Sequence, residues 1–177
     1  MAIKNSQEVI TNEEFRFAMS SWATGISVIT CMSSDNPQQP IAIVCNSIVS
    51  ISLTEKLILW SVDKSSSSYQ QWIQAPTFLI NILAEDQGGL VGRFAKKGPG
   101  KFEGLKYLCT ERGNPILEGA SVSMECSTTQ IVDTPDHSLI ISRLETLVNN
   151  NKAPLIYLHS SSWSSTQLKT KADKGNP

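Results

Sequence analysis

The 177-residue sequence predicts a mainly β protein, an antiparallel barrel or sandwich with a few helices. Segments with strand patterns outnumber helical segments, and they do not alternate regularly with helices as the strands of a parallel sheet do. The chain also lacks the G-x-G-x-x-G fingerprint, a P-loop and the G-x-S-x-G elbow. A doubly wound dinucleotide-binding sheet is therefore not expected.

Length and composition favour one soluble domain, predicted over residues 1–160, with 161–177 as a mobile or partner-contacting tail. A net charge of −1 gives no electrostatic footprint for nucleic acid. Only 18 % of residues are charged, which is low for a small monomer and favours a subunit interface. No segment reaches the roughly 20 apolar residues of a membrane helix.

The four cysteines lack the close spacing of a metal site, so no metal is expected. The N-terminal residues do not combine a basic segment with an apolar core, as a secretory signal does. The sequence therefore predicts a cytoplasmic protein with reduced thiols.

The first element is a helix, predicted over residues 11–21. Thr11 or Asn12 can cap it, and Glu13 and Glu14 occupy the first turn, where carboxylates stabilise the helix dipole. Apolar residues follow at spacings of three and four, which places them on one face.

Period-two alternation predicts the strands, most clearly over 41–53, which reads as one strand bent near its middle. Residues 137–148 alternate as a strand but also fit a helix; the β-rich context favours the strand. The other strands are expected at 25–32, 56–62, 77–83, 116–117, 120–132 and 153–158. Short helices are expected at 66–74 and 85–94, and a flexible basic loop at 96–104.

The polar face of the 41–53 strand is the main functional signal. It carries Asn46, Ser47, Ser50 and Ser52 rather than the Lys and Glu of an ordinary solvated face. Short side chains let a flat ligand approach the backbone and hydrogen-bond to its edge. The serine cluster at 63–68 adds hydroxyls and a cation for an anionic group. We expect the two stretches to hold a phosphorylated planar cofactor; the alternative is an ordinary serine-rich edge and turn.

Two further groups are candidates. His137 lies in a turn beside Asp136, which could fix its tautomer, although a simple surface turn is the alternative. Gln87, Phe94 and Ala95 could contact a ring, although Phe94 alone reads as a core residue.

The chain shows no pattern for hydrolysis by its own side chains. It lacks a Ser-His-Asp order, paired carboxylates and H-E-x-x-H, so a cofactor is expected to supply the difficult chemistry. Lys101 and Arg143 are possible phosphate partners that also fit solvated positions.

Taken in order, these pieces resemble the flavin reductase-like family of FMN-binding split barrels, the reductase components of two-component flavin monooxygenases. The resemblance runs from about residue 13 to 158 in the family's order and spacing. Its segments are FRFAMSSWATGISVIT (15–30), NSIVSISL (46–53), VDKSS (62–66), FLINILA (78–84) with Gln87, GRFA (92–95), GNPILEGA (113–120), EC (125–126), DH (136–137) and PLIY (154–157).

The resemblance implies an antiparallel Greek-key split β-barrel that forms a homodimer. It also implies an NAD(P)H:flavin oxidoreductase that reduces FMN or FAD by hydride transfer from NADH or NADPH and supplies reduced flavin to a separate oxygenase component. By position, Asp136 and His137 would lie on the nicotinamide side, with His137 as the catalytic residue. The flavin would contact Val44, Cys45, Asn46, Ser47, Val49, Ser50, Asp63, Lys64, Ser65 and Ser66, and Phe94 and Ala95 would close the pocket.

Three departures from the family pattern leave alternatives open. Residues 41–45 read Ile-Ala-Ile-Val-Cys where Gly-Met-Thr is common, residues 54–56 replace Pro-Pro, and Pro135 replaces the glycine of Gly-Asp-His. Pro135 motivates a flavin-binding protein without reductase turnover, because proline removes an N–H donor. The altered residues 41–45 motivate a binding or assembly module that has lost the cofactor.

Overall fold

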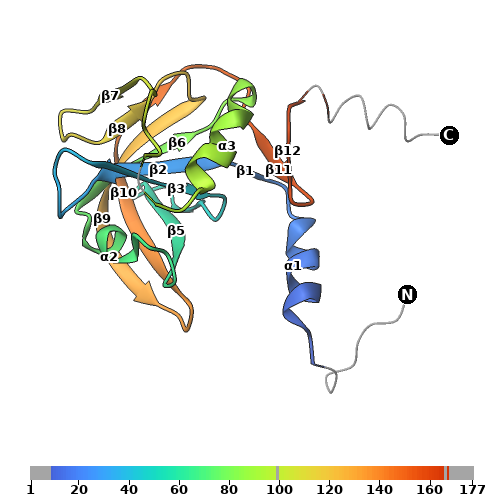
Figure 1. Cartoon of the computed structure of the whole chain (residues 1–177). Coiled ribbons are helices and arrows are strands. Elements are labelled where there is room, and N and C mark those ends of the chain that lie inside the picture. The colour runs from blue at the N-terminus through green and yellow to red at the C-terminus, as the bar shows by residue number, and fades with distance from the viewer. Residues whose placement is uncertain (1–8, 99, 166, 168–177) are drawn as a thin grey trace.

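A computed structural model describes residues 9–98, 100–165 and 167, and its centre is a curled seven-stranded antiparallel sheet (Figure 1). The order across this sheet is β3-β2-β6-β9-β10-β5-β4. Its strands are β2 (Ser27–Met32), β3 (Pro40–Cys45), β4 (Val49–Ser52), β5 (Leu57–Asp63), β6 (Thr77–Ile82), β9 (Val122–Asp133) and β10 (His137–Asn149). The predicted mainly β, antiparallel class is confirmed, and 137–148 is strand rather than helix.

Smaller elements complete the fold. One sheet joins β1 (Thr24–Gly25), β11 (Ile156–Leu158) and β12 (Ser161–Trp163), and a hairpin joins β7 (Tyr107–Cys109) to β8 (Pro115–Leu117). The helices are α1 (Asn12–Ser20), α2 (Tyr69–Gln74), the 3-10 turn η1 (Glu85–Gln87) and α3 (Gly88–Ala95). Among the residues that the structure describes, no helix is both long and apolar enough to span a bilayer.

Strands β7 and β12 were not expected from the sequence, because three residues are too few to show an alternation. Strand β12 pairs with β11, although it lies within the segment 161–177 predicted as a tail. Most of that segment is outside the described residues. The domain boundary at residue 160 and the role of the tail stay predictions.

The segment 41–53 is not one bent strand but two strands on opposite edges of the sheet. Strand β3 pairs with β2, whereas β4 pairs with β5. Residues 46–48 cross between the edges, and Ser47 Oγ accepts the N–H of Ser61 at 3.1 Å. The prediction failed because side chains alternate in the same way along one strand and along two strands joined by a short link.

The core consists of two apolar clusters on the two faces of the sheet. Inside the barrel, the Trp60 ring meets those of Trp72 and Phe78 edge to face, with centroids 5.7 and 5.5 Å apart. On the outer face, α3 places Phe94 against Phe102, with centroids 5.2 Å apart. Such aromatic contacts add specific geometry to the hydrophobic burial.

Strand β3 contributes to both clusters. Ile41, Ile43 and Cys45 pack in the barrel core, and Ala42 and Val44 pack on the outer face near α3. The altered residues 41–45 therefore have a regular two-sided strand pattern, and their outer face is the one that a ligand can approach.

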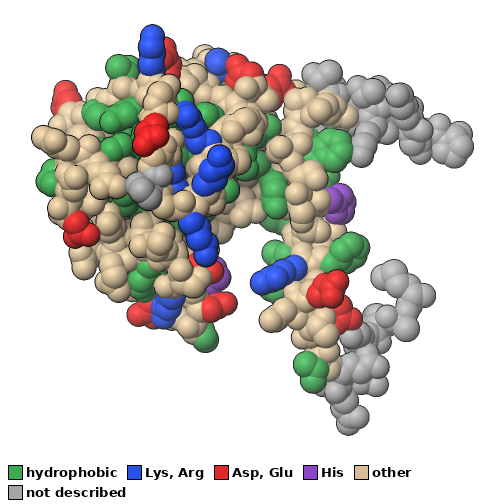
Figure 2. Space-filling model, in the orientation of Figure 1, with side chains coloured by type: hydrophobic (Ala, Val, Ile, Leu, Met, Phe, Trp, Pro, Cys, Tyr) green, Lys and Arg blue, Asp and Glu red, His purple; other side chains and the backbone are tan. Residues whose placement is uncertain are grey.

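Helix α1 extends away from the barrel and buries none of its residues (Figure 1). Thr11 and Glu14 form a reciprocal capping box, so the N-cap is Thr11. Phe15 and Phe17 are 61 % and 74 % exposed, and Trp22, just beyond the helix, is 71 % exposed. Figure 2 shows hydrophobic side chains on the part of the molecule that stands apart from the barrel, where Figure 1 places α1. Exposed aromatics on this scale indicate a contact surface.

Candidate functional site

A groove of about 320 Å³ lies between β3, the turn after β5 and the end of α3; we call it the lysine groove. It brings together six residues that the sequence predicts for the cofactor. These are Val44, Asp63, Ser65, Ser66, Phe94 and Ala95. The remaining lining residues are Ala42, Ile43, Ser67, Ser68, Lys96, Lys97 and Lys101. Of the 41–53 stretch, only Ala42, Ile43 and Val44 line this groove beside the serine cluster, whereas the polar residues Asn46 and Ser47, expected to meet that cluster, line other hollows.

The turn after β5 presents exposed hydroxyl groups to this groove. Asp63 Oδ1 accepts the backbone N–H of Ser65 at 2.7 Å, and this hydrogen bond lowers the pKa of the Asp63 carboxyl. Ser68 Oγ is occupied by the indole N–H of Trp72 at 3.0 Å. The Ser65 hydroxyl also hydrogen-bonds to the Asp63 carboxylate, whereas the Ser67 hydroxyl makes no hydrogen bond within the described part of the chain. Both serines are exposed, so their hydroxyls can contact a ligand.

Three lysines oppose one carboxylate in the lining, so the groove is positive. Lys97 is close enough to Asp63 for its charge to lower the Asp63 pKa further. Lys101 Nζ donates to the carbonyl oxygens of Ala42 and Phe94, both at 2.9 Å, and burial lowers its pKa. Figure 2 shows Lys and Arg side chains along this face. Cations and hydroxyls are the groups that bind phosphate.

Lys96 and Lys97 were missed as site residues. The sequence marks them only as the start of a basic loop, and their distance from the serine cluster along the chain hides their proximity to it. Because Lys96 and Lys97 directly follow the predicted site residues Phe94 and Ala95, that adjacency could have identified them.

Two further hollows lie near the lysine groove. A cleft of about 170 Å³, the Asn46 cleft, is lined by Ile26, Val44, Asn46, Val91 and Tyr157. It shares Val44 with the lysine groove and Asn46 with a cavity of about 650 Å³ beside α1. Neighbouring hollows therefore share one lining residue each, Val44 on β3 and Asn46 just after it.

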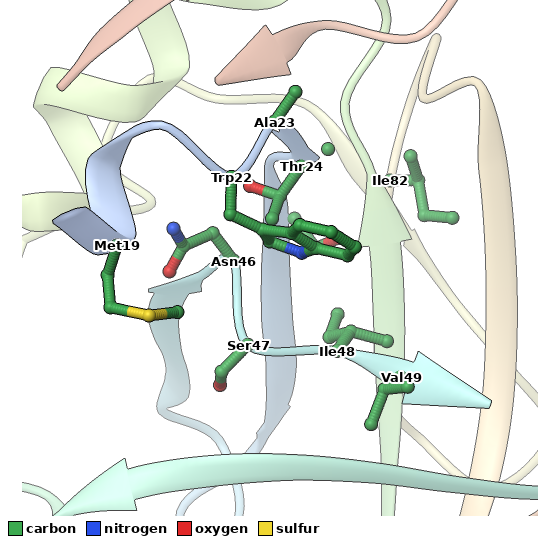
Figure 3. A pocket seen from close by; sticks show the side chains of 11 residues that line it. Met19, Trp22, Ala23, Thr24, Asn46, Ser47, Ile48, Val49 and Ile82 are labelled. Atoms are coloured by element: carbon green, nitrogen blue, oxygen red, sulfur yellow. The ribbon is translucent and has the colours of Figure 1, made fainter. Parts of the chain in front are cut away.

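The cavity beside α1 is lined by small polar and apolar groups, among them the predicted residues Ser47 and Val49. Figure 3 shows Met19 and Trp22 on the helix side and the segment 46–49 running past them. Thr24 Oγ1 is buried here without a hydrogen-bond partner, and the Asn46 amide makes no hydrogen bond within the described residues. Among the residues that line this cavity, residue chemistry alone marked only Asn46 and Ser47 as candidates.

Five predicted residues line none of these hollows: Asp136 and His137, described below, and Cys45, Ser50 and Lys64. Lys64 Nζ donates to the Thr134 carbonyl at 2.7 Å and lies 3.3 Å from the Asp133 carboxylate, so it braces the β9–β10 turn. Cys45 points into the barrel core, where burial raises the pKa of its thiol. Ser50 is exposed on β4, opposite Ile58.

Two weaker candidates also have structural roles. Gln87 accepts the N–H of Ala84 at 3.0 Å and donates to the Glu118 carbonyl at 2.8 Å, which stabilises η1. Arg143 lies 3.6 Å from the Glu55 carboxylate, away from the groove. Neither Gln87 nor Arg143 lines the lysine groove or the Asn46 cleft.

His137 begins β10 directly opposite Asp63, at the end of the lysine groove. Its Nδ1 lies 3.1 Å from the Asp136 carboxylate, and this hydrogen bond lowers the pKa of Asp136. The backbone N–H of Lys64 donates to the Asp136 carbonyl at 2.9 Å and fixes the turn against β5. The predicted Asp136–His137 pair is therefore held beside the predicted serine cluster.

Pro135 fits this turn. The N–H of Thr134 donates to the His137 carbonyl at 2.9 Å, and the N–H of His137 donates to Thr134 Oγ1 at 3.1 Å. Position 135 is the corner between them, where proline is favoured and no N–H is required. The replacement of glycine thus leaves the turn closed.

The chain belongs to the flavin reductase-like family: the family's "Flavin reductase like domain" matches residues 19–164. It is 36 % identical over 144 residues to the reductase component of the flavin-dependent trigonelline monooxygenase of Acinetobacter baylyi, covering 81 % of this chain but 46 % of that one. It is 32 % identical over 146 residues to the FMN reductase (NADH) SmoA of Agrobacterium fabrum, covering 82 % of each. The chain thus spans about half the length of the first relative and most of the second.

A solved structure confirms the fold. The nitrilotriacetate monooxygenase component B homologue of Mycobacterium thermoresistibile superposes with a TM-score of 0.80 at 26 % identity, covering 93 % of this chain and 89 % of that one. The predicted antiparallel split β-barrel and the resemblance read from the sequence are both confirmed.

Proposed function

We propose that this chain is an NAD(P)H-dependent flavin reductase that reduces FMN or FAD and supplies the reduced flavin to a separate oxygenase component. One observation carries the proposal: the lysine groove gathers six residues predicted for the flavin site from three separate segments, together with three lysines. Two relatives, an FMN reductase (NADH) and the reductase component of a monooxygenase, support the same activity.

The residues of the groove suit a flavin. Half-buried Val44 offers apolar surface for a flat ring, and Phe94, only 1 % exposed, packs in the apolar cluster behind the groove. The hydroxyls of Ser65 and Ser67 and the ammonium of Lys97 suit a phosphate. A bound flavin supplies the redox chemistry, because its ring accepts a hydride from a reduced nicotinamide. The protein's part is to hold the two rings in reach of each other, which can contribute about 7 kcal/mol or more.

His137 and Asp136 are proposed to contact the nicotinamide. They lie at the end of the groove, the His137 side chain is 38 % exposed, and Asp136 orients its ring. The two alternatives are less well supported. Pro135 closes its turn without loss of a hydrogen bond, and residues 41–45 form a regular strand that lines the groove.

Steady-state oxidation of NADH and NADPH with added FMN or FAD tests the activity. We expect turnover, and we expect His137→Asn to raise the KM for the nicotinamide by about tenfold through loss of one hydrogen-bonding group, with the Kd for flavin unchanged. The chain's second histidine provides the matched control, because His159→Asn should alter neither constant. Flavin binding without oxidation of either nicotinamide would instead favour a flavin carrier.

A homodimer is proposed from the exposed apolar surface. Besides the aromatics of α1, the edge strand β4 and the residue after it leave Val49, Ile51 and Leu53 at 49 %, 46 % and 90 % exposure. The low share of charged residues fits such an interface. In a symmetric dimer, a second copy of the chain would bury the apolar residues of both α1 and β4.

Sedimentation velocity tests the dimer at micromolar concentration. Phe17→Asp places a charge on α1 and is expected to shift the protein to monomers. Leu108→Asp, at 68 % exposure on β7 across the barrel from α1, is the matched control and should remain dimeric (Figure 1). A monomeric wild-type protein would contradict the proposal.

An oxygenase partner is proposed because a relative is the reductase component of a flavin-dependent monooxygenase. A cytoplasmic location is proposed from the free thiols. All four cysteines are unpaired, which suits a reducing compartment.

A further inference from the structure

A chain of polar contacts joins the serine cluster after β5 to the turn that presents His137. Lys64 directly follows β5. Its ammonium donates to the Thr134 carbonyl at 2.7 Å and lies 3.3 Å from the Asp133 carboxylate. Asp133 ends β9, and Thr134 begins the turn that leads to His137. One side chain from the serine cluster therefore holds two consecutive residues of the opposite turn.

The Asp133 carboxylate has a second donor, which links it to α2. Ser138, fully buried on β10, donates its hydroxyl hydrogen to Asp133 Oδ1 at 2.6 Å. A hydroxyl has one hydrogen, so the Tyr69 hydroxyl, 2.7 Å away at the start of α2, is the donor to Ser138. The hydrogen bond from Ser138 and the ammonium of Lys64 lower the pKa of Asp133, which keeps this carboxylate ionised at neutral pH.

Thr134 connects the ammonium of Lys64 to the backbone of His137. Its Oγ1 accepts the N–H of His137 at 3.1 Å and donates to the carbonyl of His137 at 2.9 Å. Its own carbonyl is the group to which Lys64 donates. A shift of the ammonium would therefore move Thr134 and, with it, the residue that carries the imidazole.

We propose that Lys64 is a positioning residue for nicotinamide oxidation: its ammonium holds the turn that presents His137, and it does not bind the flavin phosphate. This inference rests on the proposed function, in which His137 contacts the nicotinamide. The placement of the ammonium supports it. Lys64 does not line the lysine groove, although three other lysines do, and its charge is already engaged by a carbonyl and a carboxylate.

Proton–carbon NMR spectra of the histidine rings test whether Lys64 holds His137, with the full chain and no nicotinamide present. The chain has two histidines, so His137→Asn and His159→Asn assign the two Cε1–H signals. Lys64→Met removes the ammonium but keeps the hydrogen bond from the backbone N–H of this residue to the Asp136 carbonyl. We expect it to shift the His137 signal and to leave that of His159 in place. Lys64→Arg, which retains the cation, should restore the His137 signal.

Lys152→Met is the matched control for these spectra. Lys152 forms an ion pair of nearly the same length, 3.2 Å to Asp86, and lines neither the groove nor the turn of His137. Its variant should leave the His137 signal unchanged. Should Lys64→Met fold poorly, Asp133→Asn keeps the size of the side chain, removes the carboxylate charge that faces Lys64, and should shift the same signal.

Steady-state kinetics with FMN separate positioning of His137 from general damage. Lys64→Met should raise the KM for NADH by about fivefold and leave the Kd for FMN within about twofold. Because Lys64 acts through His137, the double variant Lys64→Met with His137→Asn should have the KM of His137→Asn alone. Lys152→Met should alter neither constant.

An unchanged His137 signal in both Lys64→Met and Asp133→Asn would overturn the inference. Effects of Lys64→Met and His137→Asn on the KM that multiply in the double variant would also overturn it. Loss of FMN affinity by about tenfold or more, with riboflavin binding unchanged, would show instead that Lys64 binds the flavin phosphate. A wild-type protein that oxidises neither nicotinamide would remove the proposed function, and the NMR comparison would still decide whether Lys64 holds His137.

Discussion

Replacing Lys97 with glutamate is expected to weaken FMN binding by at least about tenfold. Lys97 lines the groove, and its charge already acts on Asp63. The variant removes one cation and places a second carboxylate beside the proposed phosphate position. At about 4 Å, a charge pair near a protein surface is worth about 1 to 4 kcal/mol, so reversing one charge exceeds a tenfold change. Calorimetric titration at two salt concentrations measures the effect, which should shrink at high salt.

Two controls separate a phosphate contact from general damage. Riboflavin, which lacks the phosphate, should bind wild-type protein and Lys97→Glu with equal affinity. Lys106→Glu makes the same charge change at an exposed position that lines none of the hollows, and it should bind FMN like the wild type. Loss of riboflavin and FMN binding to the same degree would show that Lys97 does not contact the phosphate.

The largest loss of stability is expected from Asn81→Leu, which should lower the free energy of unfolding by roughly 3–5 kcal/mol. Asn81 is fully buried, and its side-chain amide forms hydrogen bonds with four other groups. Its Nδ2 donates to the Val28 carbonyl at 3.2 Å and to Thr30 Oγ1 at 3.1 Å. Its Oδ1 accepts the N–H of Leu117 at 3.0 Å and the hydroxyl of Ser123 at 3.1 Å. Leucine has a similar volume but makes none of these hydrogen bonds, so the buried Leu117 N–H and Ser123 hydroxyl lose the acceptor that Asn81 provides.

Urea unfolding, followed by tryptophan fluorescence, measures this loss. Asn36→Ala is the control, because Asn36 is exposed and its side chain accepts only the Gln38 N–H in a surface turn. It should cost less than about 1 kcal/mol. A change below that value for Asn81→Leu would mean that water or local rearrangement replaces the four hydrogen bonds.

The fold could be predicted largely from local patterns, because most strands alternate clearly and Thr11 with Glu14 forms the cap that the sequence indicates. The position of Val44 beside Asp63 was predictable only from the family resemblance, because residue chemistry pointed to the polar residues 46–52, which do not line this groove.

The remaining features depend on which distant segments pair or pack together, and local sequence patterns do not determine this. Lys64 looked like a phosphate ligand because it lies among serines, but a strand pairing brings the Thr134 carbonyl and Asp133 carboxylate to it. The break after Cys45 was invisible because the alternation continues through it. Lys96, Lys97 and Lys101 reach the groove only because α3 packs on the outer face of β3.

The crossing at residues 46–48 has a consequence for how the barrel responds to its ligands. These three residues join the two free margins of the seven-stranded sheet, and Asn46 and Ser47 also border two of the hollows. A ligand bound there would also stabilise the link between the two edges of the sheet. Ligand binding and closure of the barrel are thus coupled through residues 46–48, so a change that stabilises one also favours the other.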